Sequence, residues 1–339
     1  MKKYIVFFIT MIFIIDLQSC HMNRSWYDKI YDDADELVQK YDYKGAANLL
    51  EAKILKYCRD YKYYMMHGAY TQSRDSGLYS AEALKDFQKA YKKKPEEYLS
   101  NYYMGSCYYS MDKYNDAVKY LEKSVKLYDP TTKLESPYYD LAAVYIQLGD
   151  YKKALENNQK TFLGNADFSE CYVQKGIILS YTEGIKPLTE NYKKAKQLEP
   201  DYLWLDHQYA WQLILLGYYE QAEKLYRGFL KENENYYWCY TDLGYAALLQ
   251  GKWDDGLKLL KKAEFLNPMY KPDLQYLSFY YFLHEKDYDK AYRYDGSARL
   301  INSEKAVLYP WKSPDEYMTY YRDNQLFQKL LKLYPVSVR

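Results

Sequence analysis

A unit of about 34 residues recurs along this chain from near Tyr27 to near Lys305. The repeat is clearest where a short turn leads into a helix-forming segment that contains alanine, as in residues 42–46, 150–155 and 287–291. Aligned on this turn, eight units begin near Tyr27, Tyr61, Tyr98, Glu135, Ser169, Leu203, Tyr237 and Lys271. A period of this length is typical of helix–turn–helix units that stack into a solenoid, so the sequence predicts an all-α fold.

Small residues recur at two fixed positions of the unit, with one exception. The eighth position holds Ala34, Gly68, Gly105, Ala142, Gly176, Ala210, Gly244 and Ser278. The facing position of the second helix holds Ala46, Ala83, Ala117, Ala154, Leu188, Ala222, Gly256 and Ala291, of which only Leu188 is large. Two antiparallel helices approach closely only where side chains are small. Large residues four positions later, such as Phe87, Leu121 and Leu260, are expected to fill the space that remains.

The period and these small residues resemble the tetratricopeptide repeat (TPR) family, and the resemblance covers most of the chain. It implies a TPR superhelix, an α-solenoid of about eight helix–turn–helix repeats. The units are expected near 27–60, 61–97, 98–131, 135–168, 169–202, 203–236, 237–270 and 271–305. Residues 306–339 are expected to form C-terminal capping helices, begun by Ser313 and divided near Asp323-Asn324.

Departures from the period are interpreted as loop insertions, which an array tolerates because each repeat contacts mainly its neighbours. They fall around residues 74–77, at residues 132–134 and at one extra residue before Ala291. In the fifth unit the usual turn is replaced by residues 182–187, and the second helix is expected to begin at Pro187.

The N-terminus has the pattern of a secretory signal. Two lysines precede a short apolar segment over residues 4–15, which is shorter than the roughly 20 residues of a membrane-spanning helix. The segment ends at Leu17-Gln18-Ser19-Cys20, which resembles the lipobox of bacterial lipoproteins. That resemblance implies a lipoprotein signal peptide over residues 1–19, cleavage before Cys20, a lipid anchor on Cys20 and a short tether over 20–26. An ordinary cleaved secretory signal is the alternative.

Localisation follows from the same resemblance. His21 follows the cysteine in place of the aspartate that retains some bacterial lipoproteins at the inner membrane. We therefore expect a lipid-anchored protein of the bacterial cell envelope, at the outer membrane and facing the periplasm, and not a cytoplasmic one.

Composition and motifs argue against several function classes. The chain has 47 Lys+Arg against 46 Asp+Glu, so no excess of positive charge favours nucleic acid. The four histidines lie in separate segments, and no nucleophile, phosphate-loop or metal-ligand spacing occurs, which predicts a non-enzyme without cofactor or metal.

The chain is tyrosine-rich, with 48 tyrosines, most of them expected at packing positions. Besides Cys20 there are Cys58, Cys107, Cys171 and Cys239, which we interpret as isolated buried thiols, with disulfides as the alternative.

The inner groove is the predicted site. In TPR proteins the first helix of each repeat lines the concave face, mainly with its second, fifth, ninth and twelfth positions. Among the side chains at these positions, the candidates for partner binding are Tyr102, Tyr109, Tyr139, Trp204, His207, Trp211, Trp238, Tyr245 and Phe279. The Lys, Arg and Asn side chains with which chaperone-binding TPR domains hold a C-terminal carboxylate are absent from the fifth positions.

Together these features predict a membrane-anchored scaffold for protein–protein interaction. It would hold a protein or peptide partner in an aromatic groove, in the assembly of an envelope or secretion complex. The alternative is a glycan-binding envelope lipoprotein, because aromatic rings also suit sugar rings.

Overall fold

The structure is a computed structural model that describes residues 61–74, 81–129, 136–162, 168–268, 270–301 and 313–335, with six single positions between 33 and 49. Several expected features lie outside the described residues: the signal peptide over 1–19, Cys20, the tether over 20–26, nearly all of the unit near 27–60, Cys58, and the insertions at 75–77 and 132–134. The chain divides into two compact units, Met1–Thr182 and Glu183–Arg339, and each is described by itself.

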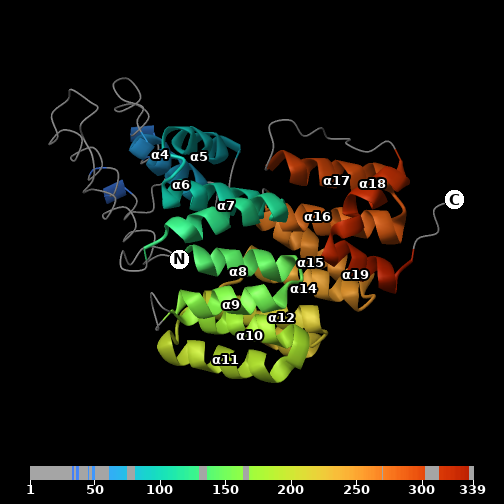
Figure 1. Ribbon diagram of the computed structural model, residues 1–339. Helices are drawn as coiled ribbons and strands as arrows, with labels where there is room; N and C mark the ends of the chain where they lie inside the picture. The colour runs from blue at the N-terminus through green and yellow to red at the C-terminus, as the bar shows by residue number, and fades with distance from the viewer. Residues whose placement is uncertain are drawn as a thin grey trace. The chain divides into compact units, whose positions relative to one another are not determined.

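Unit 1 is a succession of helices, each packed against the next along the chain (Figure 1). Its described helices are α4 (Tyr61–Arg74), α5 (Ala81–Lys93), α6 (Tyr98–Ser110), α7 (Tyr114–Leu127), α8 (Pro137–Gln147), α9 (Tyr151–Thr161) and α10 (Ser169–Glu183). The first helices of adjacent pairs, α6 and α8, also contact each other, as expected for stacked helix pairs.

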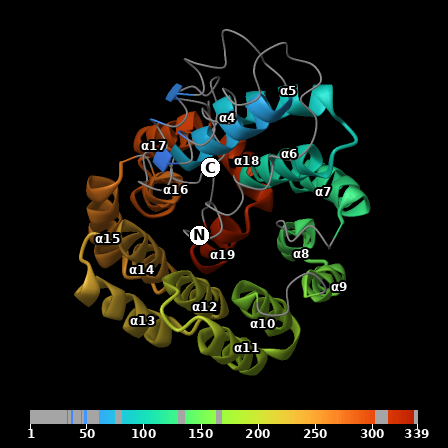
Figure 2. The same cartoon turned by 90° about the vertical axis from the view of Figure 1, so that its left-hand side faces the viewer.

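Unit 2 continues the same pattern. Its helices are α11 (Ile185–Leu198), α12 (Leu203–Leu216), α13 (Tyr219–Glu232), α14 (Tyr237–Leu249), α15 (Trp253–Leu266), α16 (Lys271–Tyr280), α17 (Tyr288–Ile301), α18 (Pro314–Tyr320) and α19 (Gln325–Leu333). Within this unit, α12, α14 and α16 form an inner row and α11, α13, α15 and α17 an outer row (Figure 2). No strand occurs among the residues described, and the predicted all-α solenoid of tandem helix pairs is confirmed.

Close packing at the small residues is also confirmed. A Cβ atom added to Gly105 would lie 2.5 Å from Leu121 Cγ, and one added to Gly244 would lie 2.8 Å from Leu260 Cγ. Both leucines are fully buried. The large residue of the second helix therefore fills the space above the glycine of the first, as the spacing predicts.

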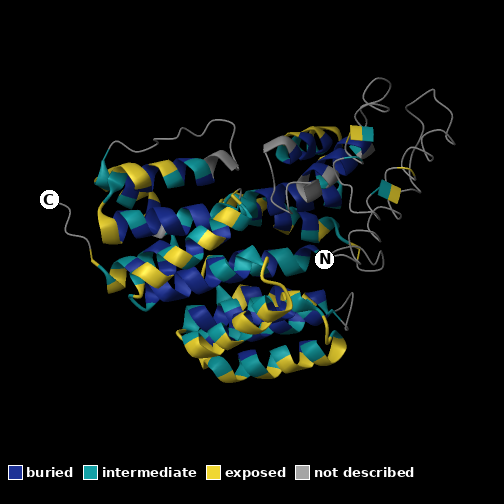
Figure 3. Cartoon of the chain, turned by 180° about the vertical axis from the view of Figure 1, so that it is seen from behind, coloured by how far each residue is buried: buried dark blue, intermediate teal, exposed yellow. Residues whose placement is uncertain are grey.

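The outer helices bury one side only. In α11, which lies at the bottom of Figure 3, Leu188 and Ala195 are buried while most other positions are exposed or half-buried. This helix begins at Ile185, two residues before the predicted Pro187, so that prediction is wrong. The reason is Gly184, whose φ of 80° lies in the left-handed region and lets the chain turn sharply before the helix.

The extra residue of the eighth unit is not in a loop. It is absorbed by a π-helical turn, Tyr281–Glu285, that directly continues α16. A π-turn accommodates one more residue than an α-turn, so the extra residue is taken up within the helix. The predicted loop insertion before Ala291 is therefore corrected to a π-turn.

Two short helices follow the last pair. Ser313 caps α18 by accepting a hydrogen bond from the Glu316 amide, and Asn324 caps α19 by accepting one from the Phe327 amide, so the predicted cap and division are confirmed. A 3₁₀ turn, Tyr321–Asp323, separates the two helices.

The two helices differ in position. α18 covers the last helix pair, where the buried Tyr317 ring stacks on Phe282 with centroids 4.3 Å apart. In contrast, α19 turns back to the inner side of the unit and packs against α14 (Figure 2). The segment therefore does more than close the end of the array, which is all that the sequence predicted for it.

None of the helices that the structure describes is both long and apolar enough to cross a membrane.

Candidate functional site

An aromatic cluster forms on the inner row of unit 2. Trp204, His207 and Trp211 are three, four and seven residues apart on α12, a spacing that places them on one helix face. The His207 ring centroid lies 5.0 Å from that of Trp204 and 4.8 Å from that of Trp238, which begins α14. Trp204 is 37% exposed, a large accessible surface for an indole, whereas Trp211 and Trp238 are half-buried. We call Trp204, His207, Trp211 and Trp238 the aromatic cluster.

A buried carboxylate fixes the His207 ring. His207 Nε2 lies 2.9 Å from Asp242 Oδ2, and the same oxygen accepts a hydrogen bond of 2.7 Å from the Tyr226 hydroxyl. Because a carboxylate only accepts, Nε2 must carry the proton. Burial, together with the Asp242 charge, holds the pKa of Tyr226 well above its usual value, so this phenol stays protonated as a donor. His207 Nδ1 is buried and has no hydrogen-bond partner in the part of the chain that is described.

The aromatic surface continues along the inner row to Tyr245 and Phe279, where α19 covers it. Trp211 lies 5.7 Å from the Tyr245 ring, and the Tyr245 hydroxyl donates to the Leu326 carbonyl of α19 at 3.1 Å. Phe279 lies 5.0 Å from Phe327, also on α19. Tyr245 and Phe279 are 0% and 1% exposed. These two predicted groove residues are on the predicted face, where α19 covers them.

The three candidates in unit 1 pack within the array. Tyr102 is buried, and both it and Ser106 donate hydrogen bonds to Asp140, the latter at 2.6 Å. Tyr109 contacts Tyr114, and Tyr139 contacts Phe168 at 5.3 Å between centroids. These contacts give the three tyrosines structural partners within unit 1.

Sequence reasoning missed a set of acids on the first helices, of which Asp242 and Asp273 are buried and Asp140 is half-buried. Asp140, Asp242 and Asp273 each pair with a polar side chain on the first helix of the preceding repeat, namely Ser106, His207 and Thr241. The partners are 34, 35 and 32 residues apart, close to one repeat. A search for acids one period after a Ser, Thr or His would have found them.

Burial raises the pKa of two of these acids. The pKa of Asp140 is raised, and that of Asp273 is raised to about 8, in both cases mainly by loss of water. Because Asp273 is fully buried and accepts a hydrogen bond from the Thr241 hydroxyl, the pair links two adjacent repeats. These contacts join the first helices of adjacent repeats.

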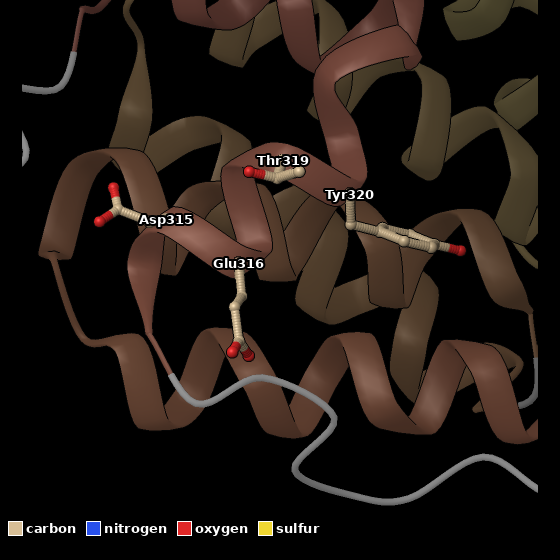
Figure 4. Close-up of a pocket in the computed structure, with 4 residues that line it drawn as sticks. All are labelled: Asp315, Glu316, Thr319 and Tyr320. Carbon is tan, nitrogen blue, oxygen red and sulfur yellow. The ribbon is translucent and has the colours of Figure 1, made fainter.

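The other features that could form a ligand site are a surface hollow, metal-binding side chains and the cysteines. A shallow hollow on α18 is lined by Asp315, Glu316, Thr319 and Tyr320, whose side chains point in different directions rather than converging (Figure 4). No cluster of His, Cys, Asp or Glu that could hold a metal ion occurs among the described residues. Cys107, Cys171 and Cys239 are buried free thiols whose pKa is raised by burial.

The comparison with protein families finds the repeat in one part of the chain. Residues 96–162, which include α6, α7, α8 and α9, match the family model described as tetratricopeptide repeat. This part of the chain is similar to the tetratricopeptide repeat. Proteins built from this repeat generally serve as non-enzymatic scaffolds that bind protein or peptide partners.

Individual relatives are distant. Over 92 residues the chain is 29% identical to response regulator aspartate phosphatase E of Bacillus subtilis (strain 168), a match that covers 26% of this chain and 24% of that protein. The match thus spans about a quarter of the relative's length.

Two solved structures are similar to parts of the chain. A tetratricopeptide repeat protein from Parabacteroides merdae ATCC 43184 is 13% identical, with 80% of this chain and 98% of that chain covered and a TM-score of 0.48. A thermophilic TPR protein of Thermus thermophilus is 22% identical, with 60% and 99% covered and a TM-score of 0.43.

Proposed function

We propose that this protein is an interaction scaffold that holds a protein or peptide partner against the aromatic cluster of unit 2. The observation that carries the proposal is the position of Trp204. Its indole is 37% exposed on the inner row, beside a His207 ring that Asp242 holds in place. Partly exposed, rigidly supported tryptophans are the residues that most often dominate binding energy at protein interfaces.

The cluster suits an apolar or aromatic side chain of a partner. Trp204, His207 and Trp238 offer ring faces and edges, and the buried Asp242 beneath them already accepts two hydrogen bonds from within the protein. Its charge is thus directed inward, and the surface left to a partner is mainly aromatic.

The test is a capture experiment with the chain beginning at His21, offered to detergent-solubilised bacterial envelopes. A partner should be retained by the wild type and lost by Trp204→Ala, whose exposed side chain can be removed with little effect on the core. Phe265→Ala is the matched control, because Phe265 is 80% exposed on α15, in the outer row. Equal retention by all three proteins, with helical content verified by circular dichroism, would place the partner elsewhere and refute the proposal.

The envelope location is part of the same proposal and depends on the N-terminal residues. Lipid attachment at Cys20 would anchor the array to a bacterial membrane, most simply the outer membrane on its periplasmic side. Incorporation of labelled palmitate into the wild type and not into Cys20→Ser is the expected result. Labelling of both proteins, or of neither, contradicts the anchor without affecting the aromatic cluster.

Glycan capture is the competing function, and a titration separates it from peptide binding. Trp204, Trp211, Trp238 and Trp253 all lie in unit 2, so tryptophan fluorescence reports on a ligand that stacks on the cluster. Oligosaccharides are expected to leave this emission unchanged. A saturable change that disappears in Trp204→Ala would favour the glycan function instead.

A further inference from the structure

The inner row of unit 2 already holds a helix, and this helix is α19 of the same chain. α19 reaches the first helices of three successive repeats. The Lys329 ammonium donates to the Leu215 carbonyl at the end of α12, Tyr245 of α14 donates to the Leu326 carbonyl, and Phe327 packs against Phe279 of α16. This is the face to which the partner-binding residues were assigned from the sequence.

The contacts of α19 define what the face accepts. Phe327 and Leu330, one helical turn apart, are fully buried, whereas Leu333 is 51% exposed. Lys329 places its charge against one of the last carbonyls of α12, where the helix dipole favours a cation. The face therefore recognises a short amphipathic helix with an aromatic residue, a leucine three positions later and a lysine between them.

The aromatic cluster is the open continuation of the covered face. Trp211 lies one helical turn before Leu215 on α12, and its ring is 5.7 Å from that of the covered Tyr245. Along α12, Trp211 therefore lies between the covered part and Trp204, which is exposed.

α18 and α19 are held by different contacts. α18 buries Tyr317 among aromatic rings, and its hydroxyl shares a hydrogen bond of 2.6 Å with Ser278; the adjoining Tyr321 donates to the buried Asp295. α19 is only nine residues long and follows a break at Asn324, whose ψ of 110° is extended. Rotation at this residue would release α19 at the cost of the ring contacts of Phe327 with Phe279, Phe282 and Tyr317. The contacts of Tyr317 with Phe282 and Ser278 do not involve α19 and would remain.

We propose that the inner row of unit 2 is a docking site for an amphipathic partner helix, and that α19 occupies it in the resting protein as a displaceable intramolecular ligand. This inference rests on the proposed scaffold function and specifies both the class of partner and its regulation. A partner helix must compete with α19. Its apparent affinity therefore equals its intrinsic affinity multiplied by the fraction of molecules in which α19 is released.

The first test needs no substitution. In hydrogen exchange on the wild-type chain, amides of residues 328–333 should exchange at least about tenfold faster than those of α14, because α19 opens without unfolding of the unit. Equal exchange rates in α19 and α14 would mean that α19 is released only by unfolding of the whole unit, which overturns the proposal.

The second test uses a fluorescently labelled synthetic peptide with the sequence of residues 324–335 as the probe. Asn324→Ala removes the cap of α19 without touching the buried face, and the lost cap should raise peptide affinity about fivefold over the wild type. A peptide carrying Phe327→Ala should not bind. Unchanged affinity in a variant that circular dichroism shows to be folded would overturn the proposal.

A second variant is expected to change the peptide affinity more than Asn324→Ala does. Phe327→Ala in the full chain should raise peptide affinity by well over tenfold, since it removes the main anchor of α19; if this variant fails to fold, Asn324→Ala and the exchange experiment decide. Failure of these tests leaves envelope capture dependent on Trp204 intact, so this inference and the proposed function fail separately. If the peptide binds but no envelope protein is captured, the docking site stands and only the envelope partner of the proposed function is refuted.

Discussion

Substitution of Gly244 by alanine tests the packing rule on which the repeat depends. An alanine at this position of α14 gains about 1 kcal/mol of helix propensity over glycine. Its Cβ, however, would lie 2.8 Å and 2.9 Å from Cγ and Cδ2 of Leu260 and 3.3 Å from the Gly256 carbonyl oxygen. Overpacking of a close-packed core costs about 1–3 kcal/mol, so Gly244→Ala should range from neutral to about 2 kcal/mol less stable than the wild type.

Gly228→Ala is the matched control for this substitution. Gly228 lies in the interior of α13 in the same unit, and a Cβ there would meet nothing within 4 Å. The control gains the same helix propensity without the clash, so it should be about 1 kcal/mol more stable than the wild type. The difference between the two variants, about 1–3 kcal/mol, is the steric cost of closing the gap between α14 and α15.

Leu260→Ala supplies the second control, because it removes the atoms that the new Cβ would strike. By itself it should cost about 2–5 kcal/mol, since Leu260 is fully buried. In that background Gly244→Ala should become stabilising, giving a coupling energy of about 1–3 kcal/mol.

Urea unfolding followed by tryptophan fluorescence is the assay, because Trp204, Trp211, Trp238 and Trp253 all lie in unit 2. The reasoning is refuted if Gly244→Ala is as stable as Gly228→Ala, or if the coupling with Leu260→Ala is near zero. Either outcome would show that the helices can separate at no cost, and that the small residues of the repeat have another role.

Two further predictions concern buried polar groups. The pKa of Asp273 is raised to about 8 from an ordinary value of 3.8, so folding takes up a proton between these values, and stability should fall by up to about 1.4 kcal/mol per pH unit as the pH rises from about 4 to 8. Asp273→Asn, which keeps an acceptor for Thr241, should remove this slope in urea unfolding measured across that range; an unchanged slope would assign it to other groups. In unit 1, Asn158 Nδ2 donates to the Cys171 carbonyl and to Gln174 Oε1, and Asn158 is fully buried. Asn158→Ala should therefore destabilise by about 1–3 kcal/mol in urea unfolding followed by far-ultraviolet circular dichroism, and a loss below about 0.5 kcal/mol would show that water replaces the side chain.

Much of the fold was predictable because the repeat is a local pattern. Gly105 and Leu121 are 16 residues apart and belong to one helix pair, so their packing follows from the spacing within a single unit. The helix start at Ser313 and the break at Asn324 are likewise set by a few neighbouring residues. The start of α11 was mislocated because Gly184 provides a turn that the proline signal alone does not reveal.

The candidate site was predictable only in part. The helical period placed Trp204, His207 and Trp211 on one face, and the structure brings Trp238 to them. The period does not indicate what lies over that face. Asp242 also went unnoticed, because its role depends on a partner in the preceding repeat.

The sequence by itself determined the repeat, the close packing at its small residues and the ends of its terminal helices, because each of these depends on residues within about one period. Only the tertiary structure decided which part of the inner row is open and which is covered. The Tyr245–Leu326 and Lys329–Leu215 contacts that hold α19 in place join residues 81 and 114 positions apart. A helix of nine residues can pack against any apolar face within its reach, and its final position depends on the complete set of side chains that it meets there.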